Sequence, residues 1–135
     1  MRTEEQETVR RLFTASTELL PDERVVRTST AGRHRLFLAV AGALYLTNQR
    51  LIFCPYLYTL SWSPIIVEIE AVTSLGAARM PIYRSISHLF VSTEWYVTAG
   101  KRTYYFSSMS EDDRDRWLAA LSSAAGVPIG ERRVF

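Results

Sequence analysis

The chain has 135 residues, a formal net charge of +2 and 22% charged residues, which is the size and composition of one folded domain and not of a disordered segment. Its longest apolar run, Leu38–Leu46, falls well short of the roughly 20 residues that a membrane-spanning helix needs, and its acidic start lacks the pattern of an export signal. The single cysteine, Cys54, excludes an intramolecular disulfide. We therefore expect a cytoplasmic domain in which Cys54 is buried as a small hydrophobic side chain.

Residues 1–21 are expected to form an amphipathic helix. Thr3-Glu4-Glu5-Gln6 matches a capping box, which predicts a helix start, and Pro21 disfavours continuation past Leu20. Apolar residues recur at helical spacing between these limits, among them Leu12 and Phe13. We expect this helix to be an added layer or a dimer contact, and Leu12 and Phe13 are candidate protein-contact residues.

Residues 22–126 carry about seven short β runs and then a second helix. The clearest pattern is Gly42–Phe53, in which Leu44 and Leu46 alternate with Tyr45 and Thr47 before a second alternating run. Asn48-Gln49 between the two runs is a two-residue loop that tolerates positive φ. The residues before this hairpin predict a first strand over 23–30 and a loop over 31–35. This stretch therefore predicts an antiparallel hairpin with one apolar face.

The second half of the chain continues the β pattern and closes with a helix. Later β runs are expected at 65–70, 87–91, 94–98 and 102–106, the last two joined by Ala99-Gly100-Lys101. Tyr104 and Tyr105 are adjacent, so one of them must point away from the core, and both are candidate protein contacts. A helix starts at Ser110 and ends at Gly126, and residues 127–135 are expected to be a tail.

The hairpin around Thr47-Asn48-Gln49-Arg50 resembles the signature hairpin of the GRAM branch of the pleckstrin-homology superfold. The resemblance extends from Glu23 to Ala125 and implies a mainly β, α+β fold. That fold is a bent seven-stranded antiparallel barrel capped by the C-terminal helix, with Trp117 packed against the barrel. The helix at residues 1–21 is extra to the minimal module.

Catalysis has little support in the sequence. The chain has two histidines, no nucleophile or phosphate-loop motif, and no ligand pair at metal spacing, so we expect no enzyme activity, no cofactor and no metal site. Glu68 and Glu70 share one face of a predicted strand, but alternation along a strand places such charges in solvent by default. We therefore look for function in the distribution of charge.

Positive charge is concentrated in the middle of the chain, where residues 24–110 hold nine Arg and Lys against three acids. In lipid-binding pleckstrin-homology domains, cations of the first interstrand loop and its flanking strands hold a phosphorylated head group. The resemblance therefore implies Arg27, Arg33, His34 and Arg35 as lipid-binding candidates, and Arg50 could join them. We expect a non-catalytic module that associates peripherally with anionic phospholipid at the inner membrane face.

An adaptor or self-associating scaffold module is the alternative. It would use the two helices and exposed tyrosines, and it predicts oligomers and indifference to lipid. Nucleic acid is not expected as a partner, because the net charge is modest and no predicted helix carries a basic face. The sequence leaves open the identity of the ligand, the head-group specificity, the oligomeric state and the pathway.

Overall fold

The computed structural model describes residues 18–35, 38–56, 63–79 and 93–133. Its elements are β1 (Val25–Arg35), β2 (Leu38–Thr47), β3 (Arg50–Pro55), β4 (Ile65–Glu68), the 3-10 turn η1 (Ile69–Ala71), β5 (Val72–Arg79), β6 (Glu94–Ala99), β7 (Arg102–Ser107), α3 (Glu111–Ala125) and β8 (Ile129–Arg133). The predicted N-terminal helix with Leu12 and Phe13, and the β run expected at 87–91, lie outside the described residues.

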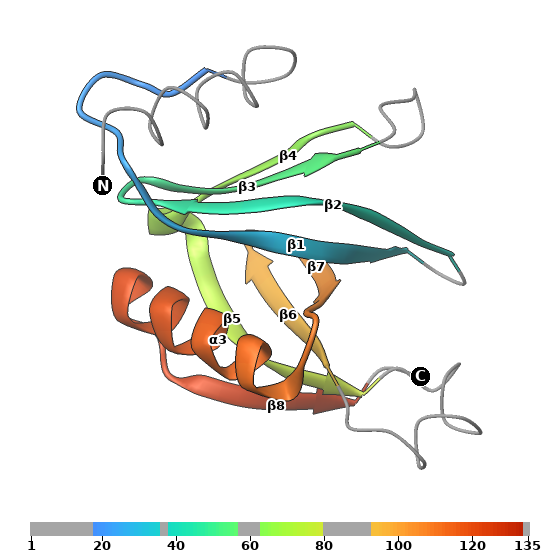
Figure 1. The fold of residues 1–135 in the computed structure, drawn as a ribbon. Coiled ribbons are helices and arrows are strands. Elements are labelled where there is room, and N and C mark those ends of the chain that lie inside the picture. The colour runs from blue at the N-terminus through green and yellow to red at the C-terminus, as the bar shows by residue number, and fades with distance from the viewer. Residues whose placement is uncertain (1–17, 36–37, 57–62, 80–92, 134–135) are drawn as a thin grey trace.

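The eight strands form one bent sheet in the order β4-β3-β2-β1-β7-β6-β5-β8. Figure 1 shows β1–β4 as an upper layer, and below it β5, β6, β8 and the helix α3. Neighbouring strands are antiparallel except β5 and β8, which are parallel. The mainly β architecture with a C-terminal helix is as predicted, but the sheet is open, with β4 and β8 at its edges. The described residues form eight strands where seven were expected. Residues 72–79 form a separate strand, β5, after the 3-10 turn, and residues 129–133 of the expected tail form β8.

Strand β1 is longer than the sequence suggested. Arg33, His34 and Arg35 belong to the strand and not to a loop: they pair with Val40, Ala39 and Leu38 of β2. Arg33 and His34 also pair with β7 on the other side. The prediction of a loop over 31–35 was therefore wrong, because pairing on both sides holds this polar stretch extended.

The predicted β2–β3 hairpin is confirmed, with Leu44 opposite Phe53 and Leu46 opposite Leu51. Its turn is not the expected positive-φ type, because Asp22 is the only non-glycine residue with positive φ in the part of the chain that the structure describes. The hydroxyl oxygen of Thr47 instead accepts hydrogen bonds from the backbone N–H of Gln49 (3.0 Å) and of Arg50 (2.8 Å). A side chain, and not a left-handed backbone, closes this turn.

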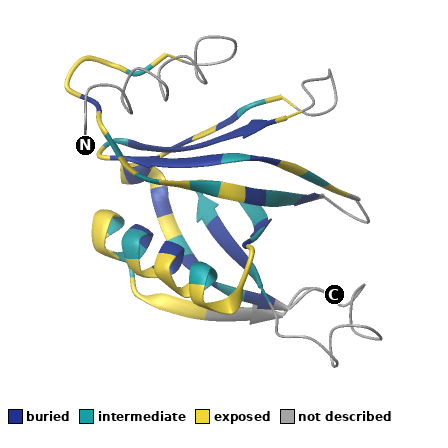
Figure 2. Cartoon of the chain, viewed as in Figure 1, coloured by how far each residue is buried: buried dark blue, intermediate teal, exposed yellow. Residues whose placement is uncertain are grey.

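The core lies between the layers and is closed by α3. Trp117 of the helix is fully buried, stacks on Trp95 of β6 with ring centroids 6.2 Å apart, and donates a 2.8 Å hydrogen bond to the hydroxyl oxygen of Ser29 in β1. The buried stripe of α3 faces the sheet in Figure 2. The predicted packing of Trp117 against the barrel is confirmed.

Helix α3 begins and ends where its sequence predicts. Ser110 is the N-cap, with its hydroxyl oxygen accepting from the backbone N–H of Asp113 at 3.0 Å, and three acids occupy the first turn, where the helix dipole favours negative charge. Gly126 ends the helix with φ 69°, a left-handed conformation that costs glycine little.

A second, smaller apolar cluster lies on the other face of β2 and β3. It contains Tyr45, Ile52 and Cys54, with Leu19 and Val25 packed against it. Burial raises the pKa of Tyr45 to about 12. Cys54 is buried there as the sequence predicted, so the sheet has apolar contacts on both faces.

Candidate functional site

Arg50 does not lie on an exposed rim. Its guanidinium makes a two-point contact with the carboxylate of Glu23, from Nε to Oε2 at 2.8 Å and from Nη2 to Oε1 at 2.6 Å, and Nη2 also donates to the carbonyl oxygen of Glu18. The two side chains are 7% and 0% exposed. Arg50 is therefore committed to an internal carboxylate and is not part of the site that we propose below.

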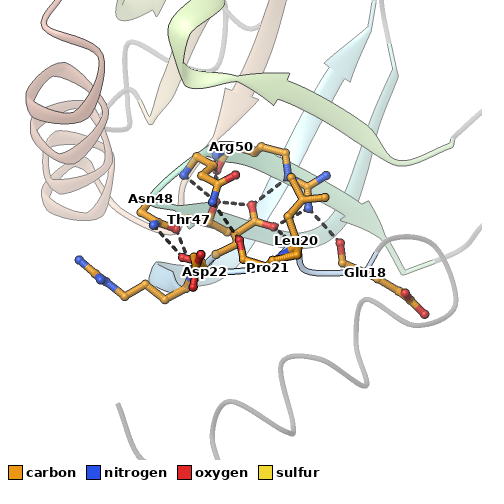
Figure 3. Close-up of polar contacts among 10 residues, drawn as sticks. Glu18, Leu20, Pro21, Asp22, Thr47, Asn48 and Arg50 are labelled. Carbon is orange, nitrogen blue, oxygen red and sulfur yellow. Dashed lines mark hydrogen bonds and ion pairs between the residues drawn. The ribbon is translucent and has the colours of Figure 1, made fainter.

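The Glu23–Arg50 pair belongs to a polar seam that ties residues 18–24 to the β2–β3 turn (Figure 3). Thr47 donates its hydroxyl to Glu23 at 2.6 Å, and Asn48 bonds through its side chain to the N–H of Arg24 and the carbonyl of Asp22. Burial alone would raise the pKa of Glu23, but hydrogen bonds from Arg50, Thr47 and the N–H of Leu20 together lower it. No sequence pattern indicates this role of Glu23. The seam fixes the start of β1.

Arg27 is held against the helix. It forms an ion pair with Asp113 of α3 at 2.7 Å, and its guanidinium carbon lies 5.2 Å from the centre of the Trp117 ring. Both contacts join β1 to α3, so Arg27 stabilises the packing of the helix on the sheet. Its charge is neutralised inside the molecule.

His34 is a poor source of positive charge. The residue is buried, and burial lowers its pKa below the ordinary 6.5, although the negative charge of Glu94 acts in the opposite direction. The neutral form therefore predominates at neutral pH.

Arg33 lies on the face of β1 that contacts the core, two positions before Arg35 at the end of the strand. Ser29 bonds to Trp117 and Ala31 is buried in the main cluster, so alternation puts Arg33 on that face, farther along the strand. The partners of Arg33, Val40 in β2 and Phe106 in β7, also belong to or pack on the core. Arg33 is half-buried at this margin. The pair lies just before the β1–β2 turn, at one end of the barrel.

Two exposed cations that the charge pattern near β1 did not reveal belong to the turn between β6 and β7. Lys101 and Arg102 are exposed, and Arg102 begins β7. Because β7 runs antiparallel to β1, the beginning of β7 and the end of β1 point to the same end of the sheet. Lys101 and Arg102 therefore share with Arg33 and Arg35 the end that we call the basic end of the barrel. The antiparallel pairing of β7 with β1 locates these two cations, and the sequence does not reveal that pairing.

The candidate protein-contact tyrosines are half-buried. Tyr104 packs partly on the core, and the Arg102 guanidinium lies 5.2 Å from its ring centre. Tyr105 pairs across the sheet with Tyr96 and His34. Their use in a contact stays a prediction.

Neither a membrane-spanning helix nor a metal cluster is found where the structure describes the chain. No helix there is long and apolar enough to cross a membrane. No group of three or more His, Cys, Asp or Glu side chains there is placed to hold a metal ion.

Comparisons by sequence give no relative, since no family model and no curated protein matches the chain. Comparison of structures does. The C-terminal domain of an unknown protein from Leishmania infantum matches with a TM-score of 0.64 at 15% identity, over 88% of this chain and 95% of that one. The Slm1-PH domain in complex with phosphoserine matches with 0.55 at 15% identity, over 76% and 96%.

The N-terminal PH domain of human ARAP2 also matches, with a TM-score of 0.55 at 12% identity over 73% of this chain and 77% of that one. The chain also matches larger DH/PH structures, such as the human ARHGEF11 DH/PH domain in a ternary complex with RhoA, of which it covers 38%. Identities this low establish shape and not activity. The bent sheet, the closing helix and these neighbours together show that the chain has the pleckstrin-homology-like fold.

Proposed function

We propose that the chain is a non-catalytic binding module of the GRAM type that attaches peripherally to anionic phospholipid at the cytoplasmic membrane face, through Arg33 and Arg35. The observation that carries the proposal is the position of Arg33 and Arg35 within the last three residues of β1, at the basic end of the barrel. The Thr47–Arg50 hairpin supports the GRAM assignment. A neighbour of the same fold that was solved with phosphoserine supports a phosphate group as ligand.

The charge balance favours this end of the molecule. Residues 24–67 contain no Asp or Glu, and two of their five arginines, Arg27 and Arg50, are paired internally. Arg33 is half-buried at the core margin, next to Val40 and Phe106, which belong to or pack on the core. Each cation near an anionic bilayer contributes about 1 kcal/mol of binding free energy. Arg33, Arg35, Lys101 and Arg102 together are enough for reversible attachment.

Cosedimentation with liposomes tests the proposal. The purified chain is mixed with neutral and with phosphatidylserine-containing vesicles at low and moderate salt. We expect salt-sensitive pelleting with the anionic vesicles only, and a loss of about 2 kcal/mol, or roughly thirtyfold in partition coefficient, for Arg33→Ala/Arg35→Ala.

The matched control is Arg24→Ala/Arg116→Ala, which removes the same net charge from exposed side chains outside the basic end. It should pellet nearly as the parent chain does. Equal loss in the two double variants would show that only net charge matters and would remove the assignment to β1. Absence of pelleting with any vesicle would refute membrane attachment.

A protein-binding adaptor is the second candidate. Three large apolar side chains of the β1–β4 layer are exposed, Val26, Tyr56 and Ile66, and exposed apolar side chains favour protein contacts. The adaptor function predicts no binding to any vesicle. It also predicts that the Val26→Ser/Ile66→Ser variant no longer binds a protein partner of the parent chain.

A further inference from the structure

The edge of β5 is completed by a strand from the far end of the described chain. β8 runs parallel to β5, with five paired positions from Leu75 opposite Ile129 to Arg79 opposite Arg133. β8 is an edge strand, and β5 is its one sheet neighbour among the strands that the structure describes. Figure 1 shows it as the outermost strand, below α3.

At residues 129 and 130, backbone pairing contributes more to holding β8 than side-chain burial does. Ile129 is 51% exposed and Gly130 has no side chain to bury, so the described start of β8 is largely open to solvent, as Figure 2 shows. Gly126, Val127 and Pro128 are its whole connection to α3. A strand whose described start buries little side-chain area, on a three-residue connection, opens locally at low cost.

The β5 edge is nonetheless shaped for this strand. A Cβ atom added at Gly76 would overlap the backbone carbonyl group of Gly130. Gly76 does not have positive φ, so the close approach of β8, and not backbone conformation, is what requires glycine there. Only a strand whose backbone can come this near to position 76 fits the edge.

We propose that the β5 edge is a strand-binding site whose second occupant is β8 of another copy of the chain, giving a strand-exchanged dimer. In a second copy, Gly130 of β8 can approach Gly76 as closely as it does within one copy. The exchanged strand therefore needs no new contact surface. Every contact that β8 makes within its own copy is made again between copies, and a short connection favours exchange. The proposal does not rest on the lipid-binding function, although a dimer would bring two basic ends to one membrane.

A disulfide trap between two single variants of the full chain tests the exchange. Ala77 and Glu131 are paired across β5 and β8, at a spacing that suits a disulfide. A tagged Ala77→Cys chain is mixed with an untagged Glu131→Cys chain at increasing concentration under mild oxidation. Exchange places the two thiols together, so a mixed disulfide dimer should accumulate with concentration. The parent chain controls for the buried Cys54, and an Ala77→Cys with Lys101→Cys mixture controls for random collision.

Two glycine variants make the test specific. Gly76→Ala in the Ala77→Cys chain obstructs the site and should lower the mixed dimer roughly tenfold or more. Gly130→Ala in the Glu131→Cys chain is the matched glycine control, because its Cβ would lie 3.3 Å from the Tyr96 hydroxyl and 3.6 Å from the Leu75 carbonyl, so the yield should stay nearly unchanged. Circular dichroism confirms that each variant is folded. A Gly-Ser insertion after Val127 lengthens the connection between α3 and β8, so it should lower the yield of mixed dimer in a chain whose β5 edge is intact.

Three results would overturn the proposal. One is no mixed disulfide above the collision control at any concentration. Another is an equal yield with and without Gly76→Ala in folded proteins. The third is rapid amide exchange at residues 129–133 in a chain that light scattering shows to be monomeric throughout, since β8 would then detach without a second copy replacing it.

Discussion

Removing the guanidinium of Arg50 should destabilise the fold far more than removing an exposed arginine. The Glu23 carboxylate accepts from Arg50 at 2.8 and 2.6 Å, from the Thr47 hydroxyl at 2.6 Å and from the Leu20 N–H at 2.8 Å. Arg50→Met removes both charged donors and leaves a buried carboxylate with two neutral ones. Breaking one side of a buried ion pair costs about 3–5 kcal/mol of unfolding free energy.

Urea denaturation followed by tryptophan fluorescence measures this cost. With a urea dependence of about 2 kcal/mol per molar, the Arg50→Met midpoint should fall by about 1.5–2.5 M. The double variant Glu23→Gln/Arg50→Met replaces the charged pair with neutral groups and should recover to within about 1–2 kcal/mol of the parent chain. Arg24→Ala, which removes an exposed arginine, is the matched control.

The loss of stability at low pH tests the Glu23–Arg50 pair independently. The folded-state pKa of Glu23 lies below its ordinary 4.5, so the stabilisation is fully present above pH 4.5 and is lost as the pH falls through the folded pKa. In the double variant, the unfolding free energy should not show this decrease at low pH. The reasoning fails if Arg50→Met moves the midpoint no more than Arg24→Ala does, or if the double variant is as unstable as the single one.

Three smaller perturbations test the helix packing, the buried histidine and the helix cap. Trp117→Phe should cost about 2–3 kcal/mol by urea denaturation, through a lost hydrogen bond and a cavity, and Ser29→Ala only about 1 kcal/mol; equal costs would contradict a packing role. His34 has a lowered pKa, so the unfolded chain binds its proton more readily and stability should rise with pH up to about 6.5, with a shallower rise in His34→Gln; identical slopes would refute this. Ser110→Ala should lower the melting temperature by the equivalent of about 1 kcal/mol, and no change in a thermal scan would exclude the cap.

Local patterns predicted the β2–β3 hairpin and the helix α3 correctly. The alternation of Leu44 and Leu46 with polar or aromatic neighbours fixed the face of β2 that meets the core, because one face of the pair is buried. Ser110 and Gly126 marked the limits of α3 because capping depends on residues near in sequence. Trp117 followed from the resemblance to the superfold.

Contacts between distant segments could not be predicted in this way. Arg33 looked like a loop residue because Gly32 precedes it and two basic residues follow it, but β2 and β7 hold it extended from both sides. Ile129 looked like part of a tail because its partner, Leu75, belongs to a strand much earlier in the chain. The pairing of Arg50 with Glu23 was hidden for the same reason, and it removed one predicted cation from the basic end.

The central place of β1 in the sheet constrains the order in which the chain can fold. β1 to β4 are neighbours both in sequence and in the sheet, so they can pair as they leave the ribosome. The other side of β1 receives β7, whose Ser107 pairs with Gly32 only after most of the chain has been made. Such long-range pairing slows folding, so a nascent chain that stalls before β7 would expose an unpaired β1 edge to chaperones or to aggregation.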